Sequence, residues 1–380
     1  MRLVIAPDKF KGSLSAPEAA EAMARGVAAV NPDATIDRVP MADGGEGTVT
    51  ALVAATAGRT RQATVAGPLG EPVRAVYGIL GHGRTAVLEM AAASGLSLVP
   101  MARRDPTRSS TRGTGELIRH AISQGATRII LGIGGSATND GGAGLGQALG
   151  FRLLDSDGEE LAPGGGDLGR LDRIEAPDAS PIADGVEILV ACDVTNPLCG
   201  PRGASAVYGP QKGATPEMVE RLDRNLSRLA DVVARDLNVD IREIPGAGAA
   251  GGLGGGLVAF AGGRLQRGVD LVIEAVRLRD RLQGADLCLT GEGALDAQSA
   301  FGKTAVGVSS LAREMGIPAI ALAGTIGEGA EAVLDEGISA YLSICPGPIS
   351  LDEAVRRGGE LLERATEQAI RIFRAGRDRP

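Results

Sequence analysis

The sequence predicts an α/β protein in which both ends of the chain form a parallel-sheet domain and a second α/β domain is inserted between them. Three observations support this fold class. The chain has 380 residues, more than one domain usually holds. Its 57 glycines are clustered, and the clusters repeatedly lie between a short apolar run and a helix-like pattern. This strand–loop–helix order occurs near both termini but is lost in residues 59–90.

The N-terminal segment is predicted to form strand, helix, strand and helix. A short apolar run, Arg2 to Ala6, predicts the first strand. Ser15 and Glu18 form a capping-box pattern, which indicates that a helix begins there. The second strand is predicted from Thr35 to Val39, before the loop MADGGEGT and the second helix. The two helices are expected to bury one apolar face each, formed by Ala19, Met23, Val27 and Val30 in the first and by Val49, Leu52 and Val53 in the second.

The middle of the chain begins with a different pattern. From Arg59 to Met90, apolar and polar residues alternate around the turn GPLGEP, with no room for crossover helices. This pattern predicts antiparallel strands and a separate domain. Further strands are predicted from Arg128 to Gly132, before the loop GGSATNDGG and a helix, and from Val186 to Cys192.

Strand–helix alternation returns near the C-terminus. Strands are predicted over residues 285–289, 318–323 and 341–344, and a long helix over residues 351–373. We therefore expect a Rossmann-like domain of residues 1–60 and 285–380 and an inserted α/β domain of residues 61–284. Candidate linkers are residues 156–169 and the glycine run after Ile244.

Composition and charge exclude several classes of protein. The net charge is −8 and aromatic residues make up 2% of the chain, so neither a broad basic surface nor stacking platforms for nucleic acid are expected. With two His and no G-x-S-x-G or H-E-x-x-H motif, a serine hydrolase or zinc protease is disfavoured. The N-terminal apolar run is too short for a signal peptide, and the uncharged stretch 244–263 contains nine glycines, which makes it a poor membrane span. The four Cys show no C-x-x-C spacing, which suits a reducing cytosol, and we expect a cytoplasmic protein.

Lysine is scarce in this chain. Of the 39 basic residues, 35 are Arg and only four are Lys: Lys9, Lys11, Lys212 and Lys303. Each Lys lies beside glycine or turn residues rather than on an obvious helix face. An ammonium group among exposed backbone N–H groups suits a phosphate or carboxylate site. The alternative is that four Lys remain by chance.

Two loops that follow predicted strands carry charged residues. In DKFKGSLSAPE, two Lys lie where a helix begins, and helix N-terminal amides bind anions at the edge of such sheets. In MADGGEGT, Asp43 and Glu46 lie beside three glycines, which suits Mg²⁺ binding or a general base. A helix N-cap formed by Asp43 would give the same pattern, and both interpretations stay open.

The segment GIGGSATNDGGAG is predicted to be a strand, a glycine loop and a helix. Its glycines allow backbone N–H groups to approach a nucleotide phosphate, with Ser136, Thr138 and Asn139 as further donors. The segment is not a Walker A loop. A G-x-G-x-x-G pattern begins at Gly246, but a single match inside a glycine run is a weak indication of a dinucleotide site.

The segment TGEGALDAQSAFGKT departs from a P-loop at Ala297, where the first glycine is missing. It presents two carboxylates, Glu292 and Asp296, together with Lys303. This set of side chains suits Mg²⁺ and phosphate together. A capped surface loop is the alternative interpretation.

A long, turn-rich segment runs from Cys192 to Thr215. Loops of this length inside compact domains are usually functional, and this one contains Asp193, Asn196, Arg202 and Lys212. By contrast, the cluster of Arg103, Arg104, Arg108 and Arg112 is interpreted as a solvated loop, with anion binding as the minority alternative.

Taken together, several of these segments resemble the bacterial glycerate kinase family. They are APDKFKGSLSA, PMADGGEGT, GIGGSATNDGGAG, ACDVTNPLCGPRGA, YGPQKGA, GAGAAGGLGGGL and LTGEGALDAQSAFGKT, in family order from Ala6 to Thr304. The resemblance implies ATP- and Mg²⁺-dependent phosphorylation of D-glycerate, with 2-phospho-D-glycerate as the expected product and 3-phospho-D-glycerate as the alternative. It also implies two α/β domains with the active site in the cleft between them.

We assign roles in such a reaction to individual residues as hypotheses. Asp193 is the expected base that receives the acceptor hydroxyl's proton, and Asp43 is the alternative. Asp296 and Glu292 are assigned to Mg²⁺. The remaining assignments are Lys303, Gly134, Gly135, Ser136 and Asn139 to the ATP phosphates, Lys9, Lys11 and Ser13 to the substrate carboxylate or the transferring phosphoryl group, and Asn196, Arg202 and Lys212 to the substrate.

Two other functions stay open at this point. A nicotinamide-dependent oxidoreductase would use the Gly246 motif, with Asp270 as the ribose partner. A non-catalytic small-anion binding protein would also explain the Lys residues, although the carboxylates in the glycine loops argue against it. No nucleic-acid or membrane partner is expected, and a homodimer is left open.

Overall fold

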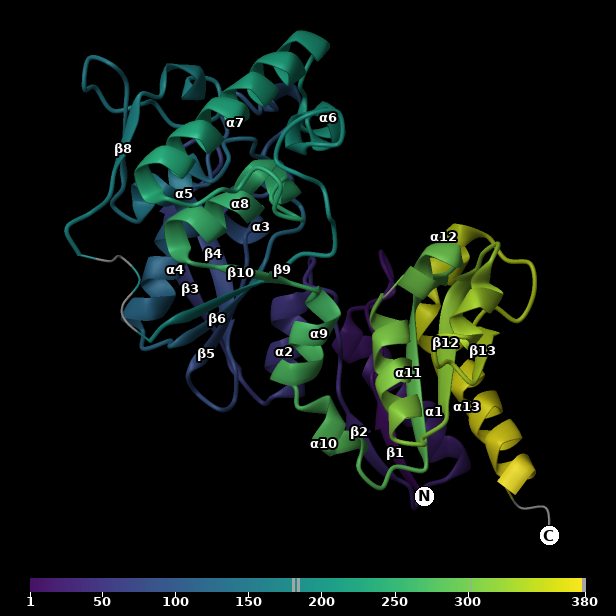
Figure 1. Cartoon of the computed structure of the whole chain (residues 1–380). Coiled ribbons are helices and arrows are strands. Elements are labelled where there is room, and N and C mark those ends of the chain that lie inside the picture. The colour runs from purple at the N-terminus through teal and green to yellow at the C-terminus, as the bar shows by residue number, and fades with distance from the viewer. Residues whose placement is uncertain (180–181, 183–184, 302, 378–380) are drawn as a thin grey trace. The chain divides into compact units, whose positions relative to one another are not determined.

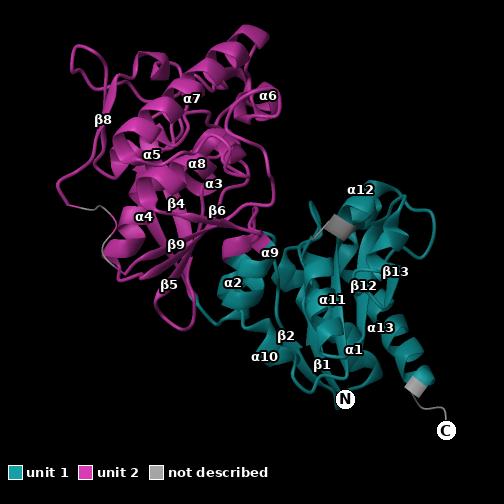
Figure 2. Ribbon diagram, viewed as in Figure 1, with its two compact units in different colours: residues 1–43, 50–58, 269–380 teal, residues 44–49, 59–268 magenta. Residues whose placement is uncertain are grey.

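The computed structural model describes residues 1–179, 182, 185–301 and 303–377 and shows an α/β fold, as predicted (Figure 1). The chain divides into two compact units (Figure 2). Unit 1 comprises residues 1–43, 50–58 and 269–380, and unit 2 comprises residues 44–49 and 59–268. Among the described residues, no helix is long and apolar enough to cross a membrane.

Unit 1 contains a five-stranded sheet in which all neighbouring strands are parallel. The chain passes from β1 to β2 on one side of the sheet, whereas β11, β12 and β13 follow one another on the other side. The strand order therefore reverses between β1 and β11, and ligands of open α/β sheets bind outside the carboxyl ends of the strands at such a point. In order across the sheet, the strands are β13 (Ala340–Ser343), β12 (Ala319–Ile326), β11 (Leu287–Leu295), β1 (Arg2–Ile5) and β2 (Thr35–Arg38).

Helices cover both faces of this sheet. On one face, Leu3 and Ile5 of β1 pack in a single cluster with Met23 of α1 (Ala16–Val30) and Leu362 of α13 (Gly358–Arg377). The other face packs against Ala305 of α11 (Thr304–Glu314). As predicted, α1 begins with a capping box, in which the Ser15 hydroxyl accepts from the backbone N–H of Glu18.

The prediction of one long helix over residues 351–373 was wrong. The segment forms two helices, α12 (Leu351–Arg356) and α13, and Arg357 has a backbone conformation that ends the first. The next residue is Gly358, where a Cβ atom would lie 2.1 Å from the hydroxyl oxygen of Ser13. The break therefore lies where the chain packs closely against the loop after β1.

Unit 2 contains a six-stranded mixed sheet. Residues 59–89 form antiparallel strands, as predicted, and the remaining strand pairs are parallel. A small antiparallel pair, β7 (Arg152–Leu154) and β8 (Arg173–Glu175), lies outside this sheet. In order across the sheet, the six strands are β10 (Arg264–Gln266), β9 (Glu187–Ala191), β6 (Arg128–Gly132), β5 (Thr85–Glu89), β4 (Pro72–Ile79) and β3 (Arg59–Ala66).

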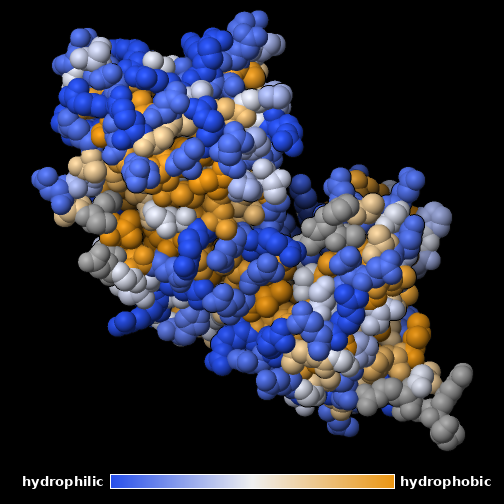
Figure 3. All heavy atoms as spheres, viewed as in Figure 1, coloured by the Kyte–Doolittle hydropathy of each residue, from blue (hydrophilic) through white to orange (hydrophobic). Residues whose placement is uncertain are grey.

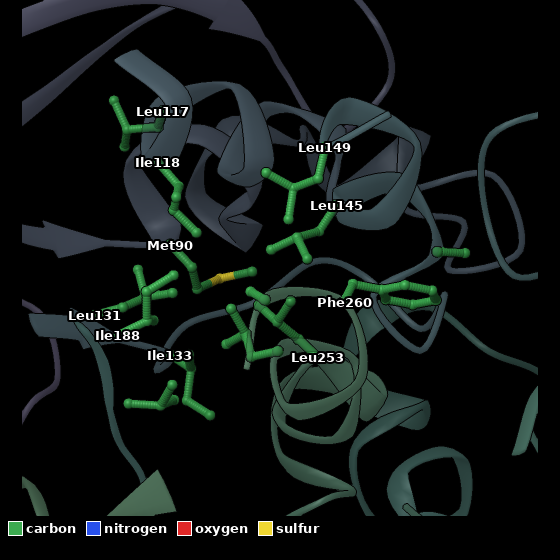
Figure 4. Close-up of a cluster of buried hydrophobic side chains, with 14 of the residues drawn as sticks. Met90, Leu117, Ile118, Leu131, Ile133, Leu145, Leu149, Ile188, Leu253 and Phe260 are labelled. Atoms are coloured by element: carbon green, nitrogen blue, oxygen red, sulfur yellow. The ribbon is translucent and has the colours of Figure 1, made fainter. Parts of the chain in front are cut away.

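The core of unit 2 lies between this sheet and its helices. Figure 4 shows Met90, Leu131 and Ile188 from the sheet side gathered with Leu145 of α5 (Ala143–Ala148) and Leu253 of α8 (Ala249–Ala261). The long amphipathic helix α7 (Pro216–Leu237) buries its apolar side, and hydrophilic side chains dominate the surface over it (Figure 3). The other helices of unit 2 are α3 (Ala91–Ser94), α4 (Arg112–Ser123) and α6 (Ala204–Tyr208), whereas all of α10 (Leu278–Leu282) and most of α2 (Thr48–Ala55) and α9 (Gly268–Ala275) belong to unit 1.

Short 3₁₀ helices connect these elements. The one that follows β11 lies between that strand and α11. The 3₁₀ helices are η1 (Leu96–Leu98), η2 (Met101–Arg103), η3 (Leu168–Arg170), η4 (Pro210–Lys212), η5 (Ala297–Phe301) and η6 (Ala330–Leu334).

Both segments that the sequence suggested as linkers lie inside unit 2. Residues 156–169 bury Leu161 and Leu168 in its core. The glycine run after Ile244 begins with turns and continues into α8, which is interrupted at residues 250–252, where φ is positive. At Gly251 a Cβ atom would lie 1.9 Å from the carbonyl oxygen of Thr138. These glycines therefore allow two backbone segments to pack closely. The sequence alone did not show whether the glycines serve close packing or a flexible linker.

Replacement of Gly132 by Ala is expected to destabilise unit 2. Gly132 ends β6, and a Cβ atom there would lie 2.1 Å from the carbonyl oxygen of Gly44, which a rigid backbone contact cannot absorb. We expect Gly132→Ala to lower the free energy of unfolding by about 1–3 kcal/mol in urea titrations. Gly376→Ala, in α13 with no atom within 4 Å of the added Cβ, is the control and is expected to have no destabilising effect. Equal unfolding midpoints for the two variants would contradict this packing argument.

Candidate active site

Carboxylates of unit 1 gather where the strand order reverses. Asp8 follows β1, and its backbone N–H donates to the carbonyl of Gly291 in the neighbouring strand β11 (2.8 Å). The backbone N–H of Met41 donates to the carbonyl of Pro7 (2.9 Å), which brings the segment before Asp43 to the same edge. Asp8, Asp43 and Glu292 are close enough that charge on the other two raises the pKa of Glu292.

Asp8 is held in a fixed orientation. Its side chain is 7% exposed, with Oδ2 accepting from the hydroxyl of Thr304 (2.6 Å) and Oδ1 accepting from the backbone N–H of Lys9 (2.6 Å). Burial raises the pKa of Asp8, and the Asp43 carboxylate raises it further, while these hydrogen bonds oppose the change. Asp8 was not among the predicted site residues, although it is the first residue of the predicted motif DKFKGSLSAPE.

Glu292 lies within β11, which extends beyond the strand predicted over residues 285–289. Its Oε1 atom is buried and has no hydrogen-bond partner among the residues that the structure describes. Burial raises the pKa of Glu292 to about 7, with neighbouring carboxylates contributing and the Lys303 ammonium opposing. A buried acceptor without a partner is costly, so this position suits a bound cation or donor.

Lys303 lies at the N-cap position of α11, beside Asp296. Its Nζ is 3.4 Å from Oδ1 of Asp296 and 3.5 Å from the hydroxyl oxygen of Ser299. The pKa of Asp296 is lowered, because the Lys303 charge and local hydrogen bonds outweigh burial, which acts in the opposite direction. Both side chains in this ion pair are 38% exposed, so the Lys303 ammonium is accessible to a ligand.

The donor set of unit 1 fits a partly protein-bound Mg²⁺. The described residues form no group of three or more His, Cys, Asp or Glu side chains arranged to hold a metal alone. In nucleotide-dependent enzymes, however, Mg²⁺ usually takes one or two carboxylates and completes its shell with phosphate oxygens and water. Of the two predicted ligands, Glu292 offers a buried oxygen without a partner, whereas Oδ1 of Asp296 already accepts from its own loop and lies near Lys303.

The loop after β1 places its three predicted residues differently. Lys9 is half-buried and its charge acts on Asp8, whereas Lys11 is exposed. The Ser13 hydroxyl donates to the carbonyl of Val355 (2.7 Å), so it fastens the loop to the C-terminal segment. This placement favours a structural role for Ser13 over a substrate contact.

In unit 2, the glycine loop after β6 has an exposed half and an anchored half. Gly134 and Gly135 are exposed, and Gly135 has a φ of +74°, a conformation that favours glycine. Ser136 and Asn139 are buried, and the Asn139 amide donates to the hydroxyl of Ser205 (2.9 Å). Only the first half of the loop is therefore positioned to present backbone N–H groups to a ligand.

The anchored half depends on two buried charged residues. The Asp140 carboxylate accepts from the backbone N–H and hydroxyl of Thr111 (2.8 and 2.9 Å) and from the N–H groups of Gly142 and Gly144. Lys212 is 1% exposed, and its Nζ donates to the carbonyl of Thr138 (2.7 Å). Lys212 was predicted to bind substrate. Because its ammonium is committed inside the fold, its position favours holding the loop instead.

The long segment after β9 presents Asp193 at the surface. Asp193 is exposed, and its Oδ1 accepts from the backbone N–H of Gly268 (2.9 Å). Both ends of the Asn196 amide are used within the segment, since it donates to the carbonyl of Arg202 (2.8 Å) and accepts from the hydroxyl of Tyr208 (2.7 Å). Asp193 and the exposed Arg202 side chain thus remain as candidates for ligand contact, and Asn196 shapes the loop.

The Gly246 pattern does not have the context of a dinucleotide site. No strand of the described residues leads directly into it, since β9 ends at Ala191 and the next strand, β10, begins at Arg264. Its glycines instead pack against neighbouring backbone, with a Cβ at Gly248 lying 2.1 Å from the carbonyl oxygen of Pro197. This arrangement argues against the oxidoreductase alternative.

Comparisons with known proteins cover both units. A family model described as the glycerate kinase family matches residues 3–374. A glycerate kinase of Bacillus subtilis (strain 168) is 53% identical, over 96% of this chain and 95% of that protein. A glycerate 2-kinase of Escherichia coli (strain K12) is 50% identical, over 99% of both chains. A crystal structure of a glycerate kinase 2 from Salmonella typhimurium LT2 matches with a TM-score of 0.92 at 48% identity and covers 100% of both chains.

Lys212→Met is expected to destabilise the protein, because the carbonyl of Thr138 loses its buried donor and Asp140 loses a nearby positive charge. We expect the free energy of unfolding to fall by about 1–3 kcal/mol in urea titrations. Lys11→Met is the matched control, since Lys11 is exposed, and a change within about 0.5 kcal/mol is expected. Equal stability of the two variants would contradict the anchoring role.

The same substitution has a pH dependence with a defined sign. Burial lowers the pKa of Lys212 from 10.5 to about 7, with the Asp140 charge opposing the change. Above pH 7 the unfolded chain therefore binds more protons here than the folded chain, and this group makes the fold more stable as the pH rises. Lys212→Met removes that contribution, so the difference in stability between wild type and variant is expected to be larger at about pH 9 than at about pH 7. A smaller difference at the higher pH would overturn this assignment.

Proposed function

The chain belongs to the glycerate kinase family, and we propose that it transfers the γ-phosphoryl group of ATP to D-glycerate, giving 2-phospho-D-glycerate and ADP. The observation that carries this proposal is the group of Asp8, Asp43 and Glu292 at the reversal of strand order in unit 1. The E. coli relative is named a glycerate 2-kinase, which supports transfer to the 2-hydroxyl.

Both substrates are anions and the chain has a net charge of −8, so the reaction needs local cations. Lys303 is exposed enough to meet a phosphate, and Lys9 and Lys11 precede the capped start of α1. Glu292, with Asp8 and Asp43 nearby, is proposed to hold Mg²⁺, and Asp296 to orient Lys303. Mg²⁺ bound there would neutralise charge on the phosphate oxygens.

Phosphoryl transfer requires mainly positioning and charge stabilisation, together with a carboxylate that accepts the proton of the attacking hydroxyl. We assign that proton to Asp193, which is exposed and oriented by the N–H of Gly268. Asp43 is the alternative base. Asp8 suits this role less well, since both of its oxygens accept hydrogen bonds within the fold.

Unit 2 is proposed to contribute the backbone N–H groups of the exposed residues Gly134 and Gly135 to phosphate binding, and the Arg202 guanidinium to the substrate carboxylate. Asn139 and Lys212 support this loop through hydrogen bonds inside the fold, and Ser136 is buried beside them in sequence. The two compact units are proposed to be the functional domains of the enzyme.

Phosphorus NMR of the protein with ATP, Mg²⁺ and D-glycerate tests the reaction. A phosphomonoester signal that appears as ATP is consumed is the expected result. Coupling to one proton identifies the 2-phosphate, and coupling to two protons identifies the 3-phosphate. If ATP and glycerate remain unchanged in the presence of folded protein, the proposed activity is contradicted.

Lys303→Met is expected to lower kcat/KM by about 10²-fold or more, because the phosphate charge loses its accessible ammonium. Lys303→Arg is expected to restore only part of the activity, since a planar guanidinium does not replace a compact ammonium. Arg313→Met serves as the control on the same helix, and its activity is expected to stay within about twofold. Coupled assays of ADP formation measure all three, and full activity of Lys303→Met would contradict the assignment.

Asp193→Asn is expected to lower kcat by about 10²–10⁴-fold with little change in KM, because the amide cannot accept the hydroxyl proton. Asp43→Asn is the comparison variant. A larger loss of kcat in Asp43→Asn than in Asp193→Asn would transfer the role of base to Asp43. Steady-state kinetics with glycerate as the varied substrate distinguish the two.

A further inference from the structure

Unit 2 contains a cavity of about 940 Å³ that none of the proposed active-site residues lines. It lies among the η2–α4 segment, residues 162–167 and the start of α7, and Leu69 of the β3–β4 turn also lines it. Its volume falls within the range of small-molecule sites in proteins.

The cavity is rich in arginine. Arg103, Arg104, Arg108 and Arg221 line it, whereas Asp105 and Asp167 are its only acidic lining residues among those described. Arg103 pairs with Glu71 (2.6 Å). Within the described part of the chain, the other three guanidinium groups form no ion pair, so their charge is available to a ligand.

One of these guanidinium groups lacks a buried hydrogen bond. The Nε atom of Arg104 is buried and has no hydrogen-bond partner among the described residues. A donor removed from water without a partner costs free energy, so a bound acceptor here would satisfy it. The Asp105 carboxylate does not meet this need, since its Oδ1 accepts from the N–H and hydroxyl of Thr107 (2.9 and 2.6 Å).

The walls of the cavity are closely packed backbone. At Gly213 (φ +95°) a Cβ atom would lie 2.7 Å from the carbonyl oxygen of Arg104. At Gly164 (φ +107°) a Cβ atom would lie 2.5 Å from the carbonyl oxygen of Thr107. The N–H of Gly166 donates to that same carbonyl (2.8 Å). These contacts fix the backbone that carries Arg104 and Arg108, so the arginines belong to a formed site.

We propose that this cavity is a second binding site, for a small molecule that carries at least two oxyanion groups, phosphate or carboxylate. Guanidinium groups bind both oxyanions through paired N–H donors, and several arginines around one cavity match several such groups on one ligand. The site is independent of the proposed kinase reaction. Arg112, the fourth arginine of the sequence cluster, does not line the cavity and pairs with Glu116.

Isothermal titration calorimetry with pyrophosphate and, separately, with citrate tests whether the site binds a ligand with phosphate groups or one with carboxylate groups. At least one probe is expected to bind wild-type protein with a Kd below about 1 mM. The double variant Arg108→Met/Arg221→Met is expected to weaken that binding by about tenfold or more. Both side chains are exposed, so the fold is expected to persist, and circular dichroism checks it.

Two control variants locate the binding. Arg224→Met changes an exposed arginine on the same helix, α7, outside the cavity, and is expected to leave the Kd within about twofold. Lys303→Met, in unit 1, is also expected to leave it within about twofold.

Four results would overturn the proposal. The first three concern the probes: neither probe binds, Arg224→Met weakens probe binding as much as the double variant does, or Lys303→Met weakens it while the double variant does not. The fourth is a rise of about tenfold in the KM for glycerate in the double variant. The last result would make the cavity part of the reaction site. Kinase activity is measured separately, so a failure of the cavity proposal is distinguishable from a failure of the proposed reaction.

Discussion

The parallel pairing of β1 with β11 is the constraint on which the arrangement of unit 1 depends. It joins the first strand of the chain to a strand from its last quarter, and the hydrogen bond from Asp8 to Gly291 continues the pairing beyond the end of β1. Because the strand order reverses here, the loops after the two strands diverge and leave space at the carboxyl ends of these strands. Asp8, Glu292 and, through the Met41 contact, Asp43 are thereby brought together, and burial raises the pKa of Glu292 to about 7.

In unit 2, the glycine-rich loop after β6 has few side chains that could pack and must be held in place by other contacts. Buried polar groups replace apolar contacts there: Asp140 collects N–H and hydroxyl donors, and Lys212 satisfies the carbonyl of Thr138. Such groups are costly to bury unless they are fully hydrogen-bonded, so the loop has few alternative conformations of similar energy. Close backbone packing at Gly251 has the same effect from the other side.

Much of the fold could be predicted because it depends on local patterns. A few neighbouring residues are enough to predict each of three features: the capping box at Ser15, the antiparallel strands in residues 59–89 and the apolar strands. The candidate site was predicted by residue type, and Glu292, Asp296 and Lys303 lie near one another, while their roles stay predictions. Burial could not be predicted in the same way. A Lys beside glycines has one sequence pattern whether its ammonium faces a ligand or, as for Lys212, a carbonyl inside the fold.

Because unit 1 is formed by separate segments of the chain, its sheet cannot be completed until late in synthesis on the ribosome. Unit 2 is almost entirely one continuous segment, residues 59–268, and all of its strands have been synthesised before β11 exists. Strands β1 and β2, made first, have no partner beyond each other until residues 287–295 emerge. During synthesis the inserted unit can therefore complete its core while the N-terminal strands wait. A chain that stops before β11 contains the residues of the glycine loop and of the arginine cavity but lacks Glu292 and Lys303.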